Sequence, residues 1–210
     1  MTSGADGYGW ETGHVPQSCG YLSPAVIGIL KRHSHPGISV CDVGSGNGVL
    51  VGDLIHAGYR AVGIECDSEG VQIACRAYPG VPFYNLGVQD DPAVVTSEQG
   101  KFEAVISTEV VEHLFSPRLL PRFAGGLLID GGLLVISTPY HGYLKNFALS
   151  LMNKWDFHHT ALWDGGHIKF WSRATLTSLL ESEGFKVIAF EGVGRLPWLW
   201  KSMIVVAKRL

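Results

Sequence analysis

CDVGSGNG, residues 41–48, holds Gly44, Gly46 and Gly48 between an apolar run and an amphipathic one. The apolar run before it predicts a buried strand, and residues 47–58 predict a helix closed by a glycine. Glycines at a strand-to-helix turn let backbone N–H groups approach a ligand that a Cβ would keep away. Ligands of open parallel sheets bind beyond the carboxyl ends of the strands, so this loop is predicted to bind one.

The alternation of strand-like and helix-like runs continues along the chain on both sides of this loop. The expected strands are residues 37–44, 59–66, 81–86, 102–109, 131–139, 186–194 and 198–210. The expected helices are residues 23–33, 47–58, 68–78, 109–115, an irregular continuation over 117–130, and 172–185. This order predicts an α/β, doubly wound fold. Its seven-stranded sheet is mainly parallel, with helices on both faces and an antiparallel final strand pair.

Composition and charge set the class of protein. The chain has 210 residues, 46% of them hydrophobic and 17% charged, which predicts one compact domain over residues 1–210. Residues 1–22 are expected to form an N-terminal arm or lid. A formal net charge of −3 gives no global positive field, so DNA binding is not expected. The start of the chain resembles no secretory signal, and the four cysteines form no CxxC pair, so we expect reduced thiols and a cytoplasmic location.

The glycine spacing separates this loop from the phosphate-binding loops. The order GxGxG lacks the GxGxxG of dinucleotide folds, and no Lys-Ser/Thr pair follows it as in a P-loop. Glu65 ends the second expected strand about twenty residues further on, where a carboxylate can accept both hydroxyls of a ribose. Asp67 is the nearby competitor for that role. A lone loop of this kind is also compatible with an ordinary tight turn.

Preceded by Asp42, the loop resembles the first motif of the Rossmann-like S-adenosylmethionine (SAM)-dependent methyltransferases. The resemblance implies that the glycine loop packs against the methionine part of SAM and that Glu65 binds its ribose. It also places residues 85–90 at the adenine, where members often have an aspartate and this chain has Gly87, so we assign Val88 and Gln89 instead. The cofactor-binding set is then Asp42, Gly44, Ser45, Gly46, Gly48, Glu65, Cys66, Val88, Gln89 and Thr108.

Residues 105–117, VISTEVVEHLFSP, follow the fourth expected strand and concentrate acids and an imidazole. If a helix starts near Thr108, then Glu109, Glu112 and His113 lie on one face at i, i+3 and i+4. Two carboxylates and an imidazole form half of a site for a divalent cation. Acids in a first turn also stabilise a helix dipole by about 0.3–1 kcal/mol each without any metal.

E-x-x-E-H followed by a later H-x-K-F resembles two groups of SAM-dependent O-methyltransferases: the ubiquinone-biosynthesis enzymes and the small-RNA 2′-O-methyltransferases. The resemblance implies that Glu109, Glu112, His113 and His167 hold Mg²⁺ or Zn²⁺. His158 and His159 compete with His167 for the fourth position. It also implies transfer to a small acceptor with vicinal hydroxyls, catechol-like, quinol-like or sugar-like, and S-adenosylhomocysteine (SAH) as the product of SAM.

Two other functions fit the same residues. A metal-independent methyltransferase could use His113 or His141 as a general base. A SAM-binding domain without transfer activity could act as a partner protein, although it would not need E-x-x-E-H.

The segment 139–168 after the fifth strand is interpreted as an acceptor-side insertion. Within it, residues 142–155 carry large apolar side chains with Lys145 and Lys154 at their flanks. This pattern fits a peripheral membrane contact or a lid over an apolar acceptor, and equally a helix packed on its own domain. Low basic density disfavours RNA as the acceptor. The oligomeric state is left open.

Overall fold

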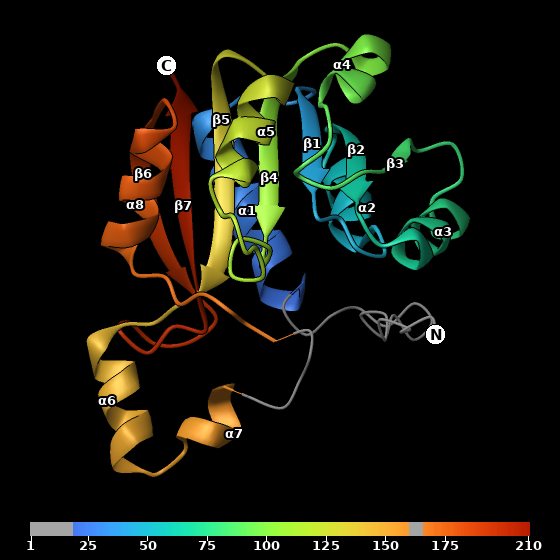
Figure 1. Ribbon diagram of the computed structural model, residues 1–210. Coiled ribbons are helices and arrows are strands. Elements are labelled where there is room, and N and C mark those ends of the chain that lie inside the picture. The colour runs from blue at the N-terminus through green and yellow to red at the C-terminus, as the bar shows by residue number, and fades with distance from the viewer. Residues whose placement is uncertain (1–18, 160–165) are drawn as a thin grey trace.

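One seven-stranded sheet organises the computed structural model, which describes residues 19–159 and 166–210 (Figure 1). Its strands are β1 (Ser39–Val43), β2 (Arg60–Glu65), β3 (Phe83–Asn85), β4 (Phe102–Thr108), β5 (Leu128–Pro139), β6 (Phe185–Val193) and β7 (Ser202–Arg209). The spatial order is β3-β2-β1-β4-β5-β7-β6. Pairs from β3 through β5 are parallel, and β7 pairs antiparallel with both β5 and β6. The fold predicted from the sequence is confirmed.

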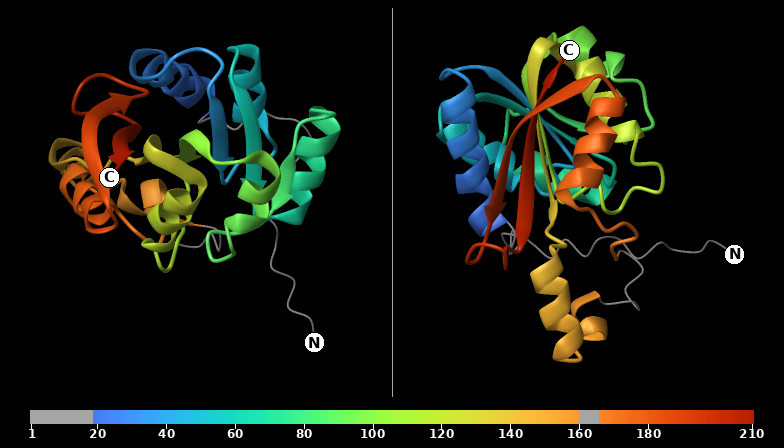
Figure 2. Two further views of the ribbon diagram at one scale, coloured as in Figure 1. Left: turned by 90° about the horizontal axis from the view of Figure 1, so that it is seen from above. Right: turned by 90° about the vertical axis from the view of Figure 1, so that its left-hand side faces the viewer.

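Helices cover both faces of the sheet, as the views in Figure 2 show. They are α1 (Cys19–His33), α2 (Val49–His56), α3 (Ser68–Ala77), α4 (Ala93–Gln99), α5 (Leu119–Leu127), α6 (Tyr143–Leu151), α7 (Trp155–His159) and α8 (Arg173–Ser182). Apolar residues of α1 and α2 pack on one face, and those of α4, α5 and α8 pack on the other. Burial on both faces explains why β1, β4 and β5 read as continuous apolar runs.

The insertion lies apart from these layers. Helices α6 and α7 lie beyond the carboxyl end of β5, at the end of the sheet where the parallel strands finish (Figure 1). Residues 160–165, the last part of the insertion before His167, are outside the described residues, and so are the side chains of Phe157 and His158. Among the described helices, none has the length and apolar run needed to cross a bilayer.

The start of α1 and the presence of α4 differ from prediction. Helix α1 begins at Cys19, so residues 19–22 are helical rather than part of an arm, while residues 1–18 are outside the described residues. Helix α4 was not predicted, because AVVTSEQ has a short apolar pattern of which Val95 is the buried residue. The apolar runs around the cysteines favoured mostly buried thiols; Cys41 is buried, but Cys66 and Cys75 are exposed.

The predicted helix over residues 109–115 is wrong. Residues 111–113 form a turn, and the next helix begins at Leu119. Glu109 adopts φ 55°, a left-handed conformation that ends the strand without starting a right-handed helix. The carbonyl oxygen of Glu112 accepts the N–H groups of Ile168 and Lys169, both at 3.0 Å, where a helix would use its own amides. Tertiary hydrogen bonds therefore override a pattern that locally fits a helix.

Candidate active site

The predicted cofactor residues come together because they follow neighbouring strands. The glycine loop follows β1, Glu65 ends β2, residues 86–89 follow β3 and Thr108 ends β4. The register pairs Val43 with Ile64 and Glu65 with Asn85, so these ends lie side by side. The residues predicted to bind the cofactor thus lie together at the carboxyl ends of the parallel strands.

Glu65 faces the glycine loop. Its side chain is buried, and its Oε2 accepts the N–H of Gly46 at 2.9 Å. Its Oε1 accepts the N–H of Asp67 at 2.8 Å and the thiol of Cys66 at 3.3 Å. Asp67 instead caps α3, where its carboxylate accepts the N–H of Glu69 at 3.0 Å. Of the two acids, Glu65 is therefore the one that contacts the glycine loop, while Asp67 caps a helix.

Two buried polar groups of the loop have no hydrogen bond within the described structure: Asp42 Oδ1 and Ser45 Oγ. Burial, and then the nearby Glu65 carboxylate, raise the pKa of Asp42 to about 8. Buried polar atoms without partners are rare in folded proteins and mark places where a ligand or water completes the bonding. Gly44 adopts φ 81°, and a Cβ there would lie 2.3 Å from Val110 Cγ2. The loop therefore requires glycine and presents polar atoms that a SAM molecule could satisfy.

The segment after β3 is organised by a residue that the sequence interpretation missed. The N–H of Gly87 donates to Asp90 Oδ2 at 2.7 Å. Val88 is half-buried and Gln89 is exposed. A carboxylate thus reaches the Gly87 position from three residues further on. The sequence NLGVQD contains this aspartate, Asp90, three residues after Gly87, the position at which family members often have an aspartate.

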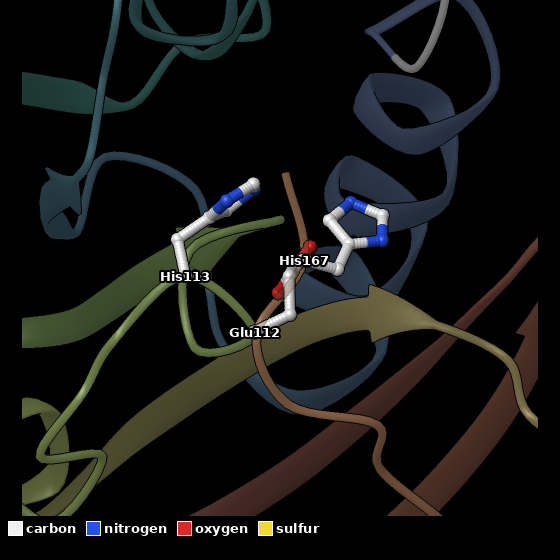
Figure 3. A group of neighbouring side chains, drawn as sticks. All are labelled: Glu112, His113 and His167. Atoms are coloured by element: carbon white, nitrogen blue, oxygen red, sulfur yellow. The ribbon is translucent and has the colours of Figure 1, made fainter. Parts of the chain in front are cut away.

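Glu112, His113 and His167 converge in Figure 3. One ligand atom of each residue lies within 4.8 Å of the other two, and no other such group of three occurs among the described residues. Glu112 is 1% exposed, and neither of its carboxylate oxygens has a hydrogen bond within the described structure. Nδ1 of His113 lies 3.3 Å from the carbonyl oxygen of Gly166, and its ring lies 5.0 Å from that of His167. The structure thus brings His167 to the turn after β4.

Of the four expected ligands, Glu109 lies outside this group. Its Oε1 accepts the hydroxyl of Ser137 at 2.8 Å, and its Oε2 accepts that of Ser202 at 3.3 Å. Because the predicted helix is a turn, Glu109 and Glu112 do not share a helix face. Burial raises the pKa of Glu109 to about 7, against the opposing effect of the two hydroxyls. Burial, and then Glu109, hold the pKa of Glu112 well above its usual range, against the smaller opposing effects of its own backbone and of the neighbouring Thr138 hydroxyl.

A cavity of about 410 Å³ adjoins the cluster, and His167 belongs to both. Glu109, His141 and His159 also line it. His141 stacks on His159 with ring centroids 5.7 Å apart and meets Phe170 edge-on at 5.0 Å. His141, the alternative general base, therefore lines this cavity, and His159 lines it without joining the ligand cluster. The sequence pattern did not identify Arg195, Lys201 or Ser202, which also line this cavity.

We expect Glu112→Gln to stabilise the protein in EDTA, increasingly so from pH 5 to pH 8. The unfolded chain releases this proton near the ordinary glutamate pKa, whereas the folded chain holds it to higher pH. The free energy of unfolding of the native protein therefore falls as pH rises through this window, and the glutamine variant escapes that loss. The gain at pH 8 should be about 1–3 kcal/mol, with about 2–4 °C in melting temperature per kcal/mol. Glu181→Gln, at an exposed position, is the control. If the two variants changed the free energy of unfolding equally at every pH, burial of Glu112 would not raise its pKa.

Comparison with known proteins assigns the chain to a family. Residues 20–189 match the family described as methyltransferase domain. The chain belongs to the methyltransferase-domain family. It is 29% identical over 163 residues to a ubiquinone biosynthesis O-methyltransferase of Methylobacterium nodulans, covering 74% of this chain and 63% of that protein. With the same-named protein of Ruegeria sp. it shares 28% over 191 residues, covering 86% of this chain and 75% of the relative. The chain thus spans just under two thirds of the first of these relatives.

Solved structures show the same fold for this methyltransferase domain. A magnesium protoporphyrin IX methyltransferase from Synechocystis PCC 6803 with bound SAH superimposes with a TM-score of 0.65 at 21% identity, covering 90% of this chain and 82% of that one. A SAM-dependent methyltransferase from Mesorhizobium loti gives a TM-score of 0.64 at 17% identity, covering 87% and 96%. The resemblance to Rossmann-like methyltransferases that the glycine loop and Glu65 indicated is confirmed.

Proposed function

We propose that this protein is a SAM-dependent O-methyltransferase that acts on a small acceptor with vicinal hydroxyls, held by a divalent cation at Glu112, His113 and His167. The observation that carries the proposal is the buried Glu112 carboxylate, which has no hydrogen bond within the described structure and faces two imidazoles. A lone buried carboxylate is costly, whereas one that coordinates a cation is not. The ubiquinone-biosynthesis relatives support an O-methyltransferase.

The donor set fits a cation and favours one kind. One carboxylate and two imidazoles match the three-ligand set of catalytic Zn²⁺ sites, whereas Mg²⁺ prefers oxygen ligands. With three protein ligands, a five-coordinate cation would have two positions for neighbouring hydroxyls, and Zn²⁺ can expand from four to five ligands. A bound cation would lower the pKa of an acceptor hydroxyl. Of the two ions that the resemblance implied, Zn²⁺ suits these residues better.

SAM, when bound, supplies an electrophilic methyl group. The glycine loop and Glu65 are assigned to its binding, because their polar atoms face one sheet edge. Glu112, His113 and His167 would orient the acceptor on the turn next to that edge, so that one oxygen is aligned with the methyl group. Ser137 and Ser202 hold Glu109 at the cavity wall, where it can accept a proton with a pKa raised to about 7.

Two rival functions remain to be separated from this one. In a metal-independent enzyme, His141 or His113 would take the hydroxyl proton directly. In an inactive partner protein, SAM would bind without transfer. Helix α6 exposes Tyr143, Phe147 and Leu151, which supports a peripheral contact with a membrane or with an apolar acceptor.

The test combines binding and turnover. Isothermal titration calorimetry should show SAM and SAH binding to the EDTA-treated protein. Methyl transfer to a catechol probe, tried as both 3,4-dihydroxybenzoate and 3,4-dihydroxybenzamide, should then require added Zn²⁺ or another divalent cation. Folded protein that binds neither SAM nor SAH would overturn the enzyme assignment. Turnover that is unchanged by EDTA would assign the chemistry to a histidine base instead, and binding without any turnover would favour the partner protein.

A further inference from the structure

The cavity beside the cation-ligand cluster is lined by three basic side chains: Lys145 from α6, and Arg195 and Lys201 from the connection between β6 and β7. These three side chains come together because β5 and β7 are paired so that Pro139, at the end of β5, lies opposite Ser202, at the start of β7. The insertion and the final connection therefore leave the sheet at the same point. Since His167 belongs to both the cluster and the cavity, an acceptor held at the cluster would extend into this space.

Lys145 is the most informative of the three. It lies at the flank of the apolar segment 142–155, as the sequence placed it, and it is 7% exposed. Its Nζ donates to the carbonyl oxygen of Tyr140 at 2.9 Å, and no second hydrogen bond from it occurs within the described residues. An ammonium has three donors. Burial, and then the charge of Arg195, lower the pKa of Lys145 to about 8, against the smaller opposing effect of the Glu109 carboxylate. A buried, repelled cation of this kind is stabilised by an anion.

The protein supplies little negative charge at this place. Glu109 is the one carboxylate among the described residues that line the cavity, and two serine hydroxyls already bind it. No salt bridge within the described part of the chain involves any of the three basic side chains. Elsewhere the protein does pair its arginines, since Arg118 and Arg122 both contact Glu183. Lys201 lies over the ring of Tyr21, 5.3 Å from its centroid, so Lys145 and Arg195 are the two that have neither a salt bridge nor a ring partner among the described residues. Such cations in a cavity are a usual basis for recognition of an anion.

We propose that this cavity binds an anionic group, a carboxylate or a phosphate, that the hydroxylated acceptor carries, and that Lys145 and Arg195 select for it. The inference rests on the proposed function, because it places the acceptor hydroxyls at Glu112, His113 and His167. To the proposed function, the inference adds that the acceptor carries a negative charge. Neutral catechols or diols would then be poor substrates, and the two basic residues would determine specificity without taking part in methyl transfer.

Paired probes test the charge alone. The acid 3,4-dihydroxybenzoate is compared with 3,4-dihydroxybenzamide, and 3,4-dihydroxybenzyl phosphate with 3,4-dihydroxybenzyl alcohol. We expect kcat/KM to be at least about tenfold higher for one of the anionic members than for its neutral partner, mostly through KM, as one or two charge-assisted hydrogen bonds provide. The pair with the larger ratio tells a carboxylate from a phosphate. Calorimetric affinity of each probe in the presence of SAH gives the same ratio without turnover.

Substitution then assigns the ratio to the cavity. Arg195→Gln, at an exposed position, and Lys145→Gln should each bring the anionic-to-neutral ratio toward one. Lys154→Gln, which removes an exposed lysine outside this cavity, should preserve it. Melting temperature and SAH affinity verify that each variant is folded; if Lys145→Gln is not, Arg195→Gln decides. Equal binding of anionic and neutral probes by the native protein, or a ratio that survives both variants, would overturn the inference, while intact SAH binding would leave the proposed function standing.

Discussion

Replacing His167 with alanine is expected to lower kcat about 100-fold or more and to leave the affinity for SAM within about twofold. His167 supplies one of three ligand atoms within 4.8 Å of one another. The residues predicted to bind SAM lie elsewhere, in the loop after β1 and at the end of β2. Loss of a ligand weakens cation binding, so the acceptor hydroxyls lose the group that orients them. Steady-state kinetics, calorimetry with SAM, and metal content by mass spectrometry measure the three effects. The same loss is expected for His113→Ala.

The control for this substitution is His35→Ala, because His35 is an exposed imidazole beside Glu103 and far from the cluster in sequence. Both variants remove an imidazole, but His35→Ala should retain native kcat and metal content. Added Zn²⁺ at high concentration should partly restore His167→Ala, since Glu112 and His113 remain. A His167→Ala variant with native kcat and native metal content would contradict the cation site. If kcat fell only in His141→Ala, the base would be His141.

The sheet and the cofactor edge were predictable because local pattern and tertiary context agree there. Apolar runs of four to eight residues between helical patterns have one stable arrangement in a doubly wound fold. The GxGxG loop and Glu65 lie at a fixed distance along the chain, so the sequence alone could place them at the same edge. The choice between Glu65 and Asp67 as the ribose-binding acid was harder, and the N-cap position of Asp67 favours Glu65.

The candidate site was predicted less well, because its geometry depends on contacts between distant segments. Helical spacing put Glu109 beside Glu112, yet the amides of Ile168 and Lys169 hold the Glu112 carbonyl and a turn results. Glu109 instead meets Ser137 and Ser202, which lie on β5 and β7. No periodicity in the sequence encodes such pairings. His167 was found through a motif, whereas Arg195 lies in a connection with no motif at all.

Glu65→Ala is expected to weaken SAM binding about 100-fold or more, which corresponds to about 2.7 kcal/mol. A carboxylate that accepts two ribose hydroxyls forms charge-assisted bonds, each of which contributes about 1.5–3 kcal/mol. The interaction is made equally in the ground state and the transition state, so KM for SAM should rise while kcat at saturating SAM changes little. Calorimetry with SAH and kinetics at varied SAM provide the measurement.

Glu65→Gln separates the ribose contact from the support of the loop. A glutamine oxygen can still accept the N–H of Gly46, as Glu65 Oε2 does at 2.9 Å, but its amide group donates where Oε1 accepts. We therefore expect an intermediate loss of about tenfold for glutamine, with a melting temperature nearer to native than that of the alanine variant. Glu69→Ala, on the exposed first turn of α3, is the control and should bind SAM normally. If alanine and glutamine weakened binding equally, the negative charge rather than the loop contact would account for the role of Glu65; if neither did, Glu65 would not bind the cofactor.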